Sequence, residues 1–494
     1  MAKDFLSNAP DGSSQNYSGT LTPPANCPGP WAKVVLTSTT SVSGRQYDRS
    51  GSLQIGGATV WFGTTQEPGG ATPTTFSFSK DITRYSALLR TPQPFSGGIG
   101  NYVTDVYTGN YAQTVSIAYY RAARRNPAPR VPDVVRGVPV ADLNPGTPTQ
   151  TATLADLPRN ITGADLELTL KGNGGDEQWF TAVPDEVAAK FPGDGLCAHS
   201  PYREAQIGLD GAAAGAVGTY PHIYSGGIVP TLWRPVLAID TLDLRPENLD
   251  LTPFAGRMVD GTSHQLSVAI SPIGDTWNVQ ATLFLYTDHH RARTSGAVTT
   301  DSVAAPTLQT TTSDIDGGAR YSVAARRHDV TAGYVDTSAG RVYSRVVSDR
   351  GYRNSGQVTD HGLVQAISQT DRESQSSVST LRGRVIANSV LAESYPITVD
   401  FSAASYVDDQ NFSLVGTVDM SQNVASATFD GRHRTVRGYL ENVSSYGNLA
   451  RTAGVTSESD GHSTTSVAGT DDGGRLHLHR ITTNHGRVVT DTGR

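Results

Sequence analysis

The segment A-D-L-E-L-T-L (Ala164–Leu170) alternates apolar and polar residues and runs directly into the glycine-rich K-G-N-G-G-D-E-Q-W-F (Lys171–Phe180). Alternation with a period of two predicts a β-strand that buries one face, here the face of its three leucines. A second segment, V-Q-A-T-L-F-L-Y (Val279–Tyr286), is apolar on both faces and predicts a strand buried between two layers. These two segments indicate a β-sandwich.

The rest of the chain has the same character. A-Q-T-V-S-I-A-Y-Y (Ala112–Tyr120) also alternates, and glycine (51) and proline (27) are abundant among the 494 residues. Long stretches with apolar residues at i, i+3, i+4 and i+7 are missing, and only Pro184–Phe191 is expected to form one or two helical turns. We therefore predict an all-β protein.

A chain of this length is too long for one ordinary core, and several domains are expected. Prolines recur between residues 127 and 148, and such a run cannot lie inside a sheet. Beyond about residue 300 the sequence is Ser/Thr-rich and alternating, with few aromatic residues. The predicted division is a flexible lead-in (1–25), a first β domain (26–125), a proline-rich linker (126–155), a second β domain (156–298) and a C-terminal β domain (299–494).

Composition argues against several classes of function. The net charge is −7, lysine is scarce and the arginines are scattered, so no basic stripe is available to follow a nucleic acid backbone. No apolar run is long enough to span a bilayer. Residues 1–10 contain no apolar stretch of the kind that a signal peptide needs, so we expect none in this sequence, although a leader removed earlier would leave the same pattern.

Cysteine and histidine usage excludes other chemistries. Cys27 and Cys197 are the only cysteines, too few for a disulfide scaffold or a thiolate zinc site, and pairing or two free thiols remain open. Asp288-His289-His290 and the alternating His477-Leu478-His479 each lack a further ligand at suitable spacing, so no metal is predicted. Nucleophile-elbow, zinc-protease and phosphate-loop motifs are missing from the sequence.

The segment from Lys171 to Pro235 combines acids, aromatic residues and arginines with many glycines. A carboxylate can move a proton or hold a sugar hydroxyl, an aromatic face suits a pyranose ring, and a guanidinium suits a carbonyl or carboxylate. Each residue alone is more often a loop or core residue, but together they indicate a ligand site. The candidates are Asp176, Glu177, Trp179, Tyr202, Arg203, Glu204, Trp233 and Arg234.

The first β segment has its own acidic candidates. Asp48 lies between Tyr47 and Arg49 just before a predicted strand, where an aromatic ring and a guanidinium can fix its rotamer and tune its acidity. A turn bracketed by an Asp–Arg pair is an equally good interpretation of this pattern alone. Further acids in this segment are Glu67, Asp81 and Asp105.

Taken together, these motifs resemble the peptide-N4-(N-acetyl-β-glucosaminyl)asparagine amidase A family, and the resemblance runs along nearly the whole chain. No single motif is decisive, but so many in the same order are highly specific. The motifs are R-Q-Y-D-R (45–49), T-Q-E-P (65–68), K-D-I-T-R-Y-S-A-L-L (80–89), Y-T-G-N-Y (107–111), G-D-E-Q-W-F (175–180), Y-R-E (202–204), Y-S-G-G-I-V-P-T-L-W-R-P (224–235), D-L-T-P-F (250–254), D-G-x-x-H (260–264), D-R-G-Y-R (349–353) and Y-P-I-T-V (395–399).

A more distant resemblance to the flavobacterial peptide:N-glycosidase F implies a fold and roles for single residues. It implies two adjacent eight-stranded jelly-roll sandwiches with the active site at their junction. The primary catalytic acid matches Asp48, and a supporting acid matches Asp105. The second catalytic carboxylate matches His199, which is a departure from the pattern, so Glu204 is the expected substitute and Glu177 the next candidate.

The resemblance implies an amidohydrolase that cleaves the bond between asparagine and the innermost N-acetylglucosamine of an N-glycan. Asp48 would activate water or act directly at the amide, Glu204 or Glu177 would orient water or the amide, and Arg49 or Arg203 would stabilise the developing oxyanion. On the glycan side, Asp176, Trp179 and Trp233 are expected.

The expected partners are N-glycosylated peptides and proteins, with no cofactor, metal, nucleic acid or membrane, and the expected protein is a secreted or periplasmic monomer. Two alternatives remain open at this point. An endo-β-N-acetylglucosaminidase would use the same carboxylate pair on a bond between sugars. A glycan-binding protein without catalysis would use the aromatic residues alone.

Overall fold

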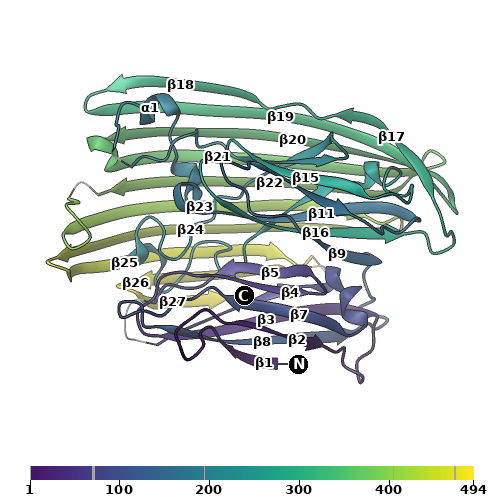
Figure 1. The fold of residues 1–494 in the computed structure, drawn as a ribbon, viewed down its shortest axis with the longest axis horizontal. Helices are drawn as coiled ribbons and strands as arrows, with labels where there is room; N and C mark the ends of the chain where they lie inside the picture. Colours follow the sequence, from purple (N-terminus) through teal and green to yellow (C-terminus); the bar gives the residue numbers. More distant parts are fainter. Residues whose placement is uncertain (1, 69–72, 194, 404, 472–473, 494) are drawn as a thin grey trace.

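The computed structural model describes residues 2–68, 73–193, 195–403, 405–471 and 474–493. Strands dominate these residues and every strand pair is antiparallel, which confirms the predicted all-β class (Figure 1). Over these described ranges, helical structure is limited to one short α-helix, α1 (Asp185–Ala188), within the segment where helical turns were expected, and to short 3-10 segments. The jelly-roll connectivity named by the resemblance stays a prediction.

The first unit contains two four-stranded sheets. One has the order β1 (Ala2–Leu6), β8 (Asn110–Arg121), β3 (Trp31–Ser43), β6 (Thr74–Asp81). The other has the order β2 (Asn16–Leu21), β7 (Gln93–Ile99), β4 (Ser50–Ile55), β5 (Ala58–Thr64). Two 3-10 segments, η1 (Thr83–Tyr85) and η2 (Leu88–Arg90), connect β6 to β7.

The second unit again contains two four-stranded sheets. One has the order β10 (Thr149–Leu154), β15 (His264–Ser271), β12 (Glu204–Leu209), β13 (Ala212–Gly218), and the other β14 (Pro246–Asp250), β11 (Ile161–Gly172), β16 (Trp277–Thr287), β9 (Val134–Val138). Its connections contain η3 (Gly174–Asp176), η4 (Trp179–Thr181), η5 (Pro230–Trp233) and η6 (Thr252–Phe254).

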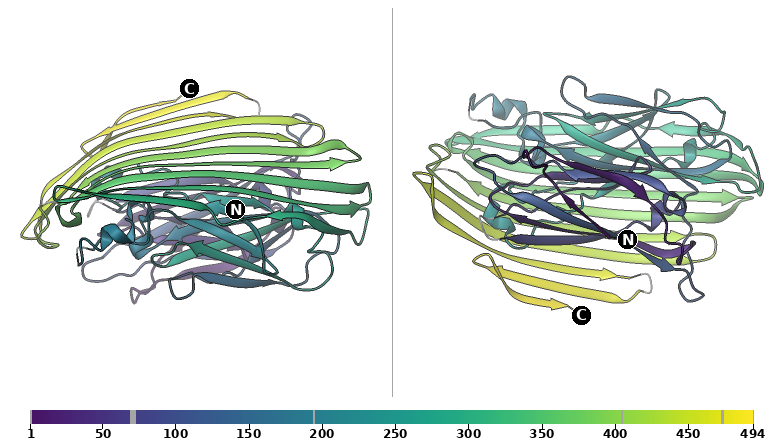
Figure 2. Two further views of the ribbon diagram at one scale, coloured as in Figure 1. Left: turned by 90° about the horizontal axis from the view of Figure 1, so that it is seen from above. Right: turned by 60° about the horizontal axis from the view of Figure 1, so that its bottom comes forward.

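The remaining strands form one sheet of eleven. In Figure 2 this sheet curves as a broad layer over the two smaller units. Its strands are β17 (Ser295–Ser302), β18 (Thr307–Ile315), β19 (Gly318–Thr337), β20 (Gly340–Thr359), β21 (Val364–Leu381), β22 (Arg384–Ser402), β23 (Phe412–Phe429), β24 (Arg434–Thr452), β25 (Val455–Thr470), β26 (Leu476–Asn484) and β27 (Arg487–Gly493), with η7 (Asp360–Gly362) between β20 and β21. We propose that these three units are the structural domains.

Four strands lie where the sequence indicated a loose lead-in or a linker. β1 and β2 fall within residues 1–25, and β9 and β10 fall within residues 126–155. All four lie at the edge of their sheets, where prolines and polar side chains are tolerated because one row of backbone groups needs no partner strand. Their sequences therefore lack the apolar alternation that identifies a central strand.

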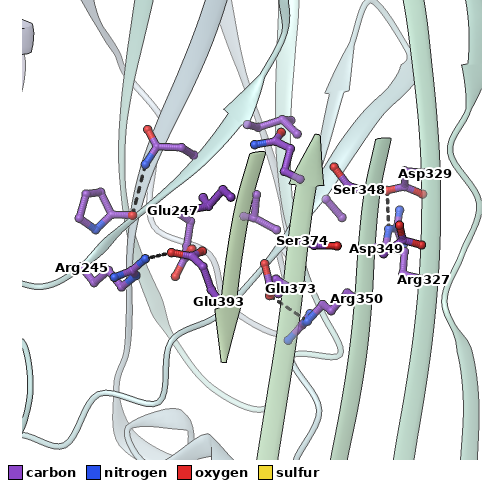
Figure 3. A pocket seen from close by; sticks show the side chains of 17 residues that line it. Arg245, Glu247, Arg327, Asp329, Ser348, Asp349, Arg350, Glu373, Ser374 and Glu393 are labelled. Atoms are coloured by element: carbon purple, nitrogen blue, oxygen red, sulfur yellow. Dashed lines mark hydrogen bonds and ion pairs between the residues drawn. The ribbon is translucent and has the colours of Figure 1, made fainter. Parts of the chain in front are cut away.

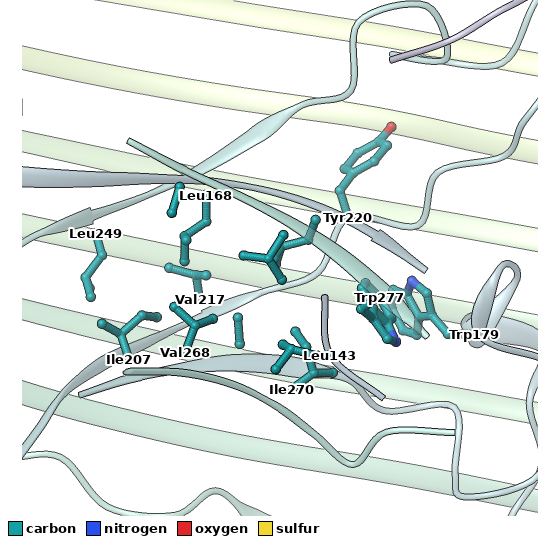
Figure 4. Packing of buried hydrophobic residues seen from close by; sticks show 14 of the residues in the cluster. Leu143, Leu168, Trp179, Ile207, Val217, Tyr220, Leu249, Val268, Ile270 and Trp277 are labelled. Carbon is teal, nitrogen blue, oxygen red and sulfur yellow. The ribbon is translucent and has the colours of Figure 1, made fainter. Parts of the chain in front are cut away.

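The cores follow the alternation in the sequence. Leu166, Leu168 and Leu170 of β11 are buried in the core of the second unit, together with the residues shown in Figure 4. β16 is buried on both faces, as predicted: Leu283 belongs to this core, whereas Phe284 packs edge-on against Tyr85 of the first unit at 5.1 Å. β16 thus joins the two small units.

Polar contacts also join these units close to the end of β5. The Trp61 indole N–H donates to the Leu242 carbonyl (2.8 Å), and the Thr64 amide N–H donates to the Thr241 carbonyl (3.1 Å). The Ser225 hydroxyl donates to the Thr65 carbonyl at 3.1 Å. These contacts hold the end of β5 and the residue after it against the segment between β13 and β14.

Candidate active site

Asp48 lies in the segment between β3 and β4 and faces the second unit. The backbone N–H of Gly226 donates to its Oδ2 at 3.4 Å, so the two units meet at this carboxylate. The neighbouring Arg49 lies beneath the Tyr47 ring, with its guanidinium carbon 3.6 Å from the ring centroid, and donates to Gln46 Oε1 at 2.8 Å. These contacts fix the loop that carries Asp48 and leave the Tyr47 ring 42% exposed.

Glu67 follows β5 and lies beside Asp48. Arg234 donates from Nη2 to Glu67 Oε1 at 2.7 Å, and the Glu67 amide N–H donates to the Ser225 hydroxyl. A Cβ added at Gly226 would lie 2.6 Å from Glu67 Oε2 and 3.5 Å from Asp48 Oδ1. A side chain at position 226 would therefore displace the Glu67 carboxylate, whereas its distance from Asp48 would be an ordinary contact.

The end of β11 and the turn after it contribute a third acid and a lysine. Glu177 follows η3, and its negative charge interacts with that of Asp48. Lys171 donates from Nζ to Asn173 Oδ1 at 2.5 Å and lies over the Tyr224 ring, 4.6 Å from its centroid. We call Asp48, Glu67, Glu177 and Lys171 the open cluster, since its acids are partly exposed.

The acids of the open cluster hold their protons unusually strongly. Burial raises the pKa of Asp48, although the Gly226 N–H and Lys171 oppose the shift. Burial raises the pKa of Glu67 to about 7; Arg234 opposes this shift and the negative charge of Asp48 adds to it. Burial and the charge of Asp48 also raise the pKa of Glu177, with Lys171 in opposition. Acids with a raised pKa can give and take protons at higher pH than ordinary carboxylic acids, and for Glu67 that range lies near neutrality.

The structure places Glu204 elsewhere, in contrast to the expectation that it faces Asp48. Glu204 begins β12 and is 0% exposed. It accepts hydrogen bonds from the Tyr202 hydroxyl at 2.6 Å and from Arg327 Nη1 of β19 at 3.1 Å. It therefore joins the second unit to the large sheet, and its lone pairs are occupied by protein donors.

A charged cavity of about 60 Å³ lies next to this network, between β13–β14 and the large sheet (Figure 3). Its walls carry ion pairs: Arg350 lies 3.0 Å from Glu373, and Arg245, directly before β14, contacts Glu393 of β22. Glu247 also lines it and is buried. We call Glu204, Glu247, Glu373 and Glu393 with their arginines the closed cluster.

Asp176 and Arg203 form a buried ion pair rather than a surface for sugar. Arg203 Nη2 lies 2.5 Å from Asp176 Oδ1, and the Trp277 indole N–H donates to Asp176 Oδ2 at 2.7 Å. Burial alone would raise the pKa of Asp176, but the hydrogen bonds and charge of Arg203 outweigh it and lower this pKa. Both side chains are fully covered, so neither reaches a ligand in this structure, contrary to the expectation.

The two tryptophans expected to stack on sugar are also covered. Trp179 and Trp233 are 2% and 0% exposed and belong to the second core. The Trp233 indole N–H donates to the Gly227 carbonyl at 2.9 Å, so this residue holds the glycine segment beside Asp48. Their size and polar edge, which suggested a sugar platform, serve packing here.

Three other predicted residues occupy different places. His199 is exposed and its ring lies 3.2 Å from Asp185, in a segment whose carbonyl groups accept from Arg203. Asp105 is exposed in the segment between β7 and β8. Arg234 does reach the open cluster, through Glu67.

The sequence interpretation named Glu67 only as a further acid of the first β segment, and it gave no role in the site to Lys171, Tyr102 or Tyr107. Tyr107 packs edge-on against Tyr47 at 5.0 Å, and Tyr102 is strongly exposed nearby, where its carbonyl accepts from Arg49. The available signals were T-Q-E-P and Y-T-G-N-Y, which lie directly after β5 and before β8. Loop residues at strand ends often carry function.

Other features bear on the chemistry. In the described ranges, no three His, Cys, Asp or Glu side chains gather as metal ligands would. Cys27 and Cys197 are both free. Searching the same described ranges for a helix long and apolar enough to cross a membrane finds none.

Comparison with known proteins identifies a matching family and a similar protein. A family model described as peptide N-acetyl-beta-D-glucosaminyl asparaginase amidase A matches residues 11–304. The peptide-N4-(N-acetyl-beta-glucosaminyl)asparagine amidase A of Prunus dulcis is 29% identical over 373 residues; the match covers 70% of this chain and 64% of that relative's length.

Two solved structures are similar to part of this chain at low sequence identity. PNGase F, a glycosylasparaginase from Flavobacterium meningosepticum, gives a TM-score of 0.35 at 14% identity over 58% of this chain and 96% of that chain. PNGF-II gives a TM-score of 0.37 at 15% identity over 56% of this chain and 61% of that chain.

Proposed function

This chain belongs to the peptide N-acetyl-β-D-glucosaminyl asparaginase amidase A family, and from that premise we propose that it removes N-glycans from peptides and proteins. The bond cleaved is the amide between the asparagine side chain and the innermost N-acetylglucosamine, and the peptide keeps an aspartate. The observation that supports this most directly is the pair Asp48 and Glu67, which approach Gly226 from the first unit, while the charge of Asp48 also acts on Glu177 of the second.

Amide hydrolysis needs a base for water and an acid for the leaving nitrogen. In the proposed reaction, ionised Asp48 takes a proton from water as the water oxygen attacks the amide carbon. Protonated Glu67 then gives its proton to the nitrogen as the carbon–nitrogen bond breaks. The sugar leaves as a glycosylamine, which hydrolyses to ammonia and the free glycan.

The second carboxylate is assigned to Glu67, with Glu177 beside it, in place of Glu204. Glu67 keeps one oxygen beside Gly226 and Asp48 while Arg234 holds the other. The carboxylate oxygens of Glu204 accept hydrogen bonds from Tyr202, Gln206 and Arg327, and Glu204 belongs to the closed cluster. A carboxylate that acts on substrate needs at least one free oxygen, and the open cluster provides it.

Acid conditions should favour this pair. The reaction needs Asp48 ionised and Glu67 protonated, so activity rises as pH passes upward through the pKa of Asp48 and falls as pH passes upward through that of Glu67, about 7. Because the pKa of Asp48 is raised, the rise of activity on the acid side of the pH profile is expected above pH 3.8, the ordinary pKa of an aspartate. The optimum is therefore expected between these two limbs, below neutrality.

The exposed tyrosines supply the contact with sugar or peptide. Tyr47 and Tyr102 offer flat faces beside the open cluster, and Tyr107 supports Tyr47. Aromatic faces with a polar edge suit pyranose rings. N-glycosylated peptides and proteins are accordingly the proposed partners, and a monomer working outside the cytoplasm, where such substrates occur, is the proposed setting.

A single digestion tests the activity. A defined N-glycopeptide is incubated in ¹⁸O-labelled water with the wild-type protein or with the Asp48→Asn variant, and the peptide is analysed by mass spectrometry. The expected product has aspartate with one ¹⁸O atom and no sugar, and the variant leaves the substrate intact. A peptide that keeps one N-acetylglucosamine would indicate an endoglycosidase, and an unchanged glycopeptide that is bound would indicate a glycan-binding protein.

A further inference from the structure

Three glycines form a row across the large sheet. Gly416 of β23, Gly447 of β24 and Gly461 of β25 are direct cross-strand partners, and all three are buried. Residues that lie opposite each other on neighbouring strands share one face of the sheet, so this face carries no side chain along the row. Glycine inside a strand often marks a place where another backbone approaches closely. We call these three residues the glycine row.

The segment that lies on the glycine row is η5, together with the residue before it. A Cβ added at Gly461 would lie 2.1 Å from the Thr231 carbonyl oxygen, and one added at Gly447 would lie 2.6 Å from Thr231 Oγ1. One added at Gly416 would lie 3.1 Å from Val229 Cγ2. The first two distances are too short for any side chain, so η5 reaches the sheet because the row consists of glycine.

Two hydrogen bonds fasten η5 to the same place. The Thr231 hydroxyl donates to the Asn448 carbonyl at 2.9 Å, and the Ser445 hydroxyl donates to the Leu232 carbonyl at 2.7 Å. Asn448 and Ser445 both belong to β24, close to Gly447. The large sheet therefore holds η5 by close backbone packing and by polar contacts.

The residues on either side of η5 reach the open cluster. Before η5, the Gly226 N–H donates to Asp48 Oδ2 at 3.4 Å. Directly after η5, Arg234 donates from Nη2 to Glu67 Oε1 at 2.7 Å. One continuous segment thus carries a donor to each of the two acids, and its middle rests on the glycine row.

Two features make this segment move as one piece. The Trp233 indole N–H donates to the Gly227 carbonyl at 2.9 Å and so braces its two ends against each other. Ile228 has a φ of 64°, in the left-handed region that a β-branched residue rarely adopts. Such a conformation persists where the surroundings impose it, and Ile228 Cγ2 lies beside the glycine row, 3.3 Å from a Cβ placed at Gly416.

We propose that the glycine row is a seat that positions the donors of Gly226 and Arg234 at the two acids, so that the large sheet controls turnover from outside the open cluster. The roles of the two acids rest on the proposed function. Gly447 and Gly461 are thus positioning residues, because a side chain at either would push η5 off the sheet and carry both donors with it. A displacement of about 1 Å that begins far from the chemistry can cost about 10²-fold in rate.

The first experiment measures kcat and KM on a defined glycopeptide for Gly447→Ala and Gly461→Ala. Per folded molecule, kcat should fall by about 10- to 100-fold, while KM stays within about twofold because the exposed tyrosines belong to the first unit. Gly438→Ala is the matched control, since Gly438 also lies in β24 but an added Cβ meets nothing within 4 Å. An unchanged kcat in both row variants, or a rise in KM alone, would overturn the proposal.

A milder pair of variants tests the seat from the side of η5 and decides the matter where alanine in the row prevents folding. Thr231→Val keeps the shape of the side chain but loses the hydroxyl that donates to Asn448, so kcat should fall by about tenfold. Thr231→Ser keeps the hydroxyl and should retain the wild-type kcat. Equal kcat values for the two variants would contradict the seat.

The third measurement does not depend on activity. Hydrogen–deuterium exchange followed by mass spectrometry reports how often backbone amides open. The peptide 224–234 should exchange faster in Gly447→Ala and in Thr231→Val, and at the wild-type rate in Gly438→Ala. Faster exchange confined to β23–β25, or no change in either variant, would overturn the proposal. Faster exchange in 224–234, with a wild-type protein that releases no glycan, would refute the proposed function and leave the seat in place.

Discussion

The open and closed clusters contain similar acids and differ in what surrounds them. Asp48, Glu67 and Glu177 lie at the junction of the two small units, with one direct arginine contact, Arg234 to Glu67. Glu204 and Glu373 lie at the junction with the large sheet, where Arg327 and Arg350 reach them from β19 and β20. The open cluster keeps free carboxylate oxygens, whereas Glu204, Glu373 and Glu393 of the closed cluster each contact an arginine.

The comparison separates chemistry from stability. A buried carboxylate paired with arginine contributes to holding units together, and breaking the pair leaves an uncompensated charge. A partly exposed carboxylate with a raised pKa can move protons to and from a substrate. Substitutions in one cluster should therefore affect turnover, and substitutions in the other should affect folding.

The largest expected effect comes from Asp48→Asn. An amide has nearly the same shape but cannot take a proton from water, so glycan release should fall by about 10⁴-fold, the upper end for one acid–base group. The melting temperature should stay near that of the wild type, because only the 3.4 Å contact with the Gly226 N–H is altered. Released glycan and thermal unfolding are measured on the same preparation; residual activity within tenfold of wild type would remove Asp48 from the base role.

Glu204→Gln tests the closed cluster with the same chemical change. Removing this carboxylate leaves the Arg327 guanidinium with Asp329 alone, and the expected loss is about 3–5 kcal/mol in the free energy of unfolding. Turnover per folded molecule should remain close to wild type. Urea unfolding followed by tryptophan fluorescence, with kcat measured well below the transition, distinguishes the two roles. A normal unfolding midpoint with lost turnover would instead place Glu204 in the reaction.

Glu67→Gln should reduce kcat by about 10²-fold, because the amide has no proton to give to the leaving nitrogen. The activity limb near pH 7 should disappear at the same time, since that limb reports Glu67. Glu177→Gln is the matched comparison at the same junction and should keep the limb. A limb that persists in Glu67→Gln and vanishes in Glu177→Gln would exchange the roles of these two acids.

Much of the fold could be predicted because local patterns determine it. The alternation in Ala164–Leu170 and the apolar segment Val279–Tyr286 correspond to buried central strands, β11 and β16. Edge strands such as β1 and β9 were missed, since an edge tolerates the polar residues and prolines that mark loops.

The site was less predictable because the accessibility of a side chain depends on strands that are distant in the sequence. Nothing near Glu204 in the sequence indicates that Arg327 will cover it, and nothing near Trp233 indicates that its ring will be buried. Asp48 could be identified from its neighbours, whereas its partner Glu67 depends on how β5 ends against Thr241. Residue type suggests chemistry, and only the packing decides whether it is accessible.

The smallest expected effect concerns the closed cluster and is a change in how the free energy of unfolding depends on pH. Burial raises the pKa of Glu373 to about 8, and Arg350 opposes the shift. The folded protein therefore holds a proton that the unfolded chain, with an ordinary pKa near 4.5, releases, so stability is fully present below about pH 4.5 and declines as pH rises towards 8. One such proton gives a slope of at most about 1.4 kcal/mol per pH unit.

Glu373→Gln imitates the protonated acid and should reduce this slope most between pH 7 and 8, because the raised pKa of Glu67, about 7, adds its own slope at lower pH. The activity profile should stay unchanged. Urea unfolding at several pH values between 5 and 8 measures the slope, with Lys190→Met, at an exposed lysine paired with Asp314, as a control that keeps it. A slope between pH 7 and 8 that survives in Glu373→Gln but is lost in Glu67→Gln would place the uptake of that proton in the open cluster, and the division between the two clusters would then fail. The comparison depends on this separation, because both junctions contain acids with a raised pKa, and the closed one is distinguished by its burial and by arginine contacts such as those of Arg327 and Arg350.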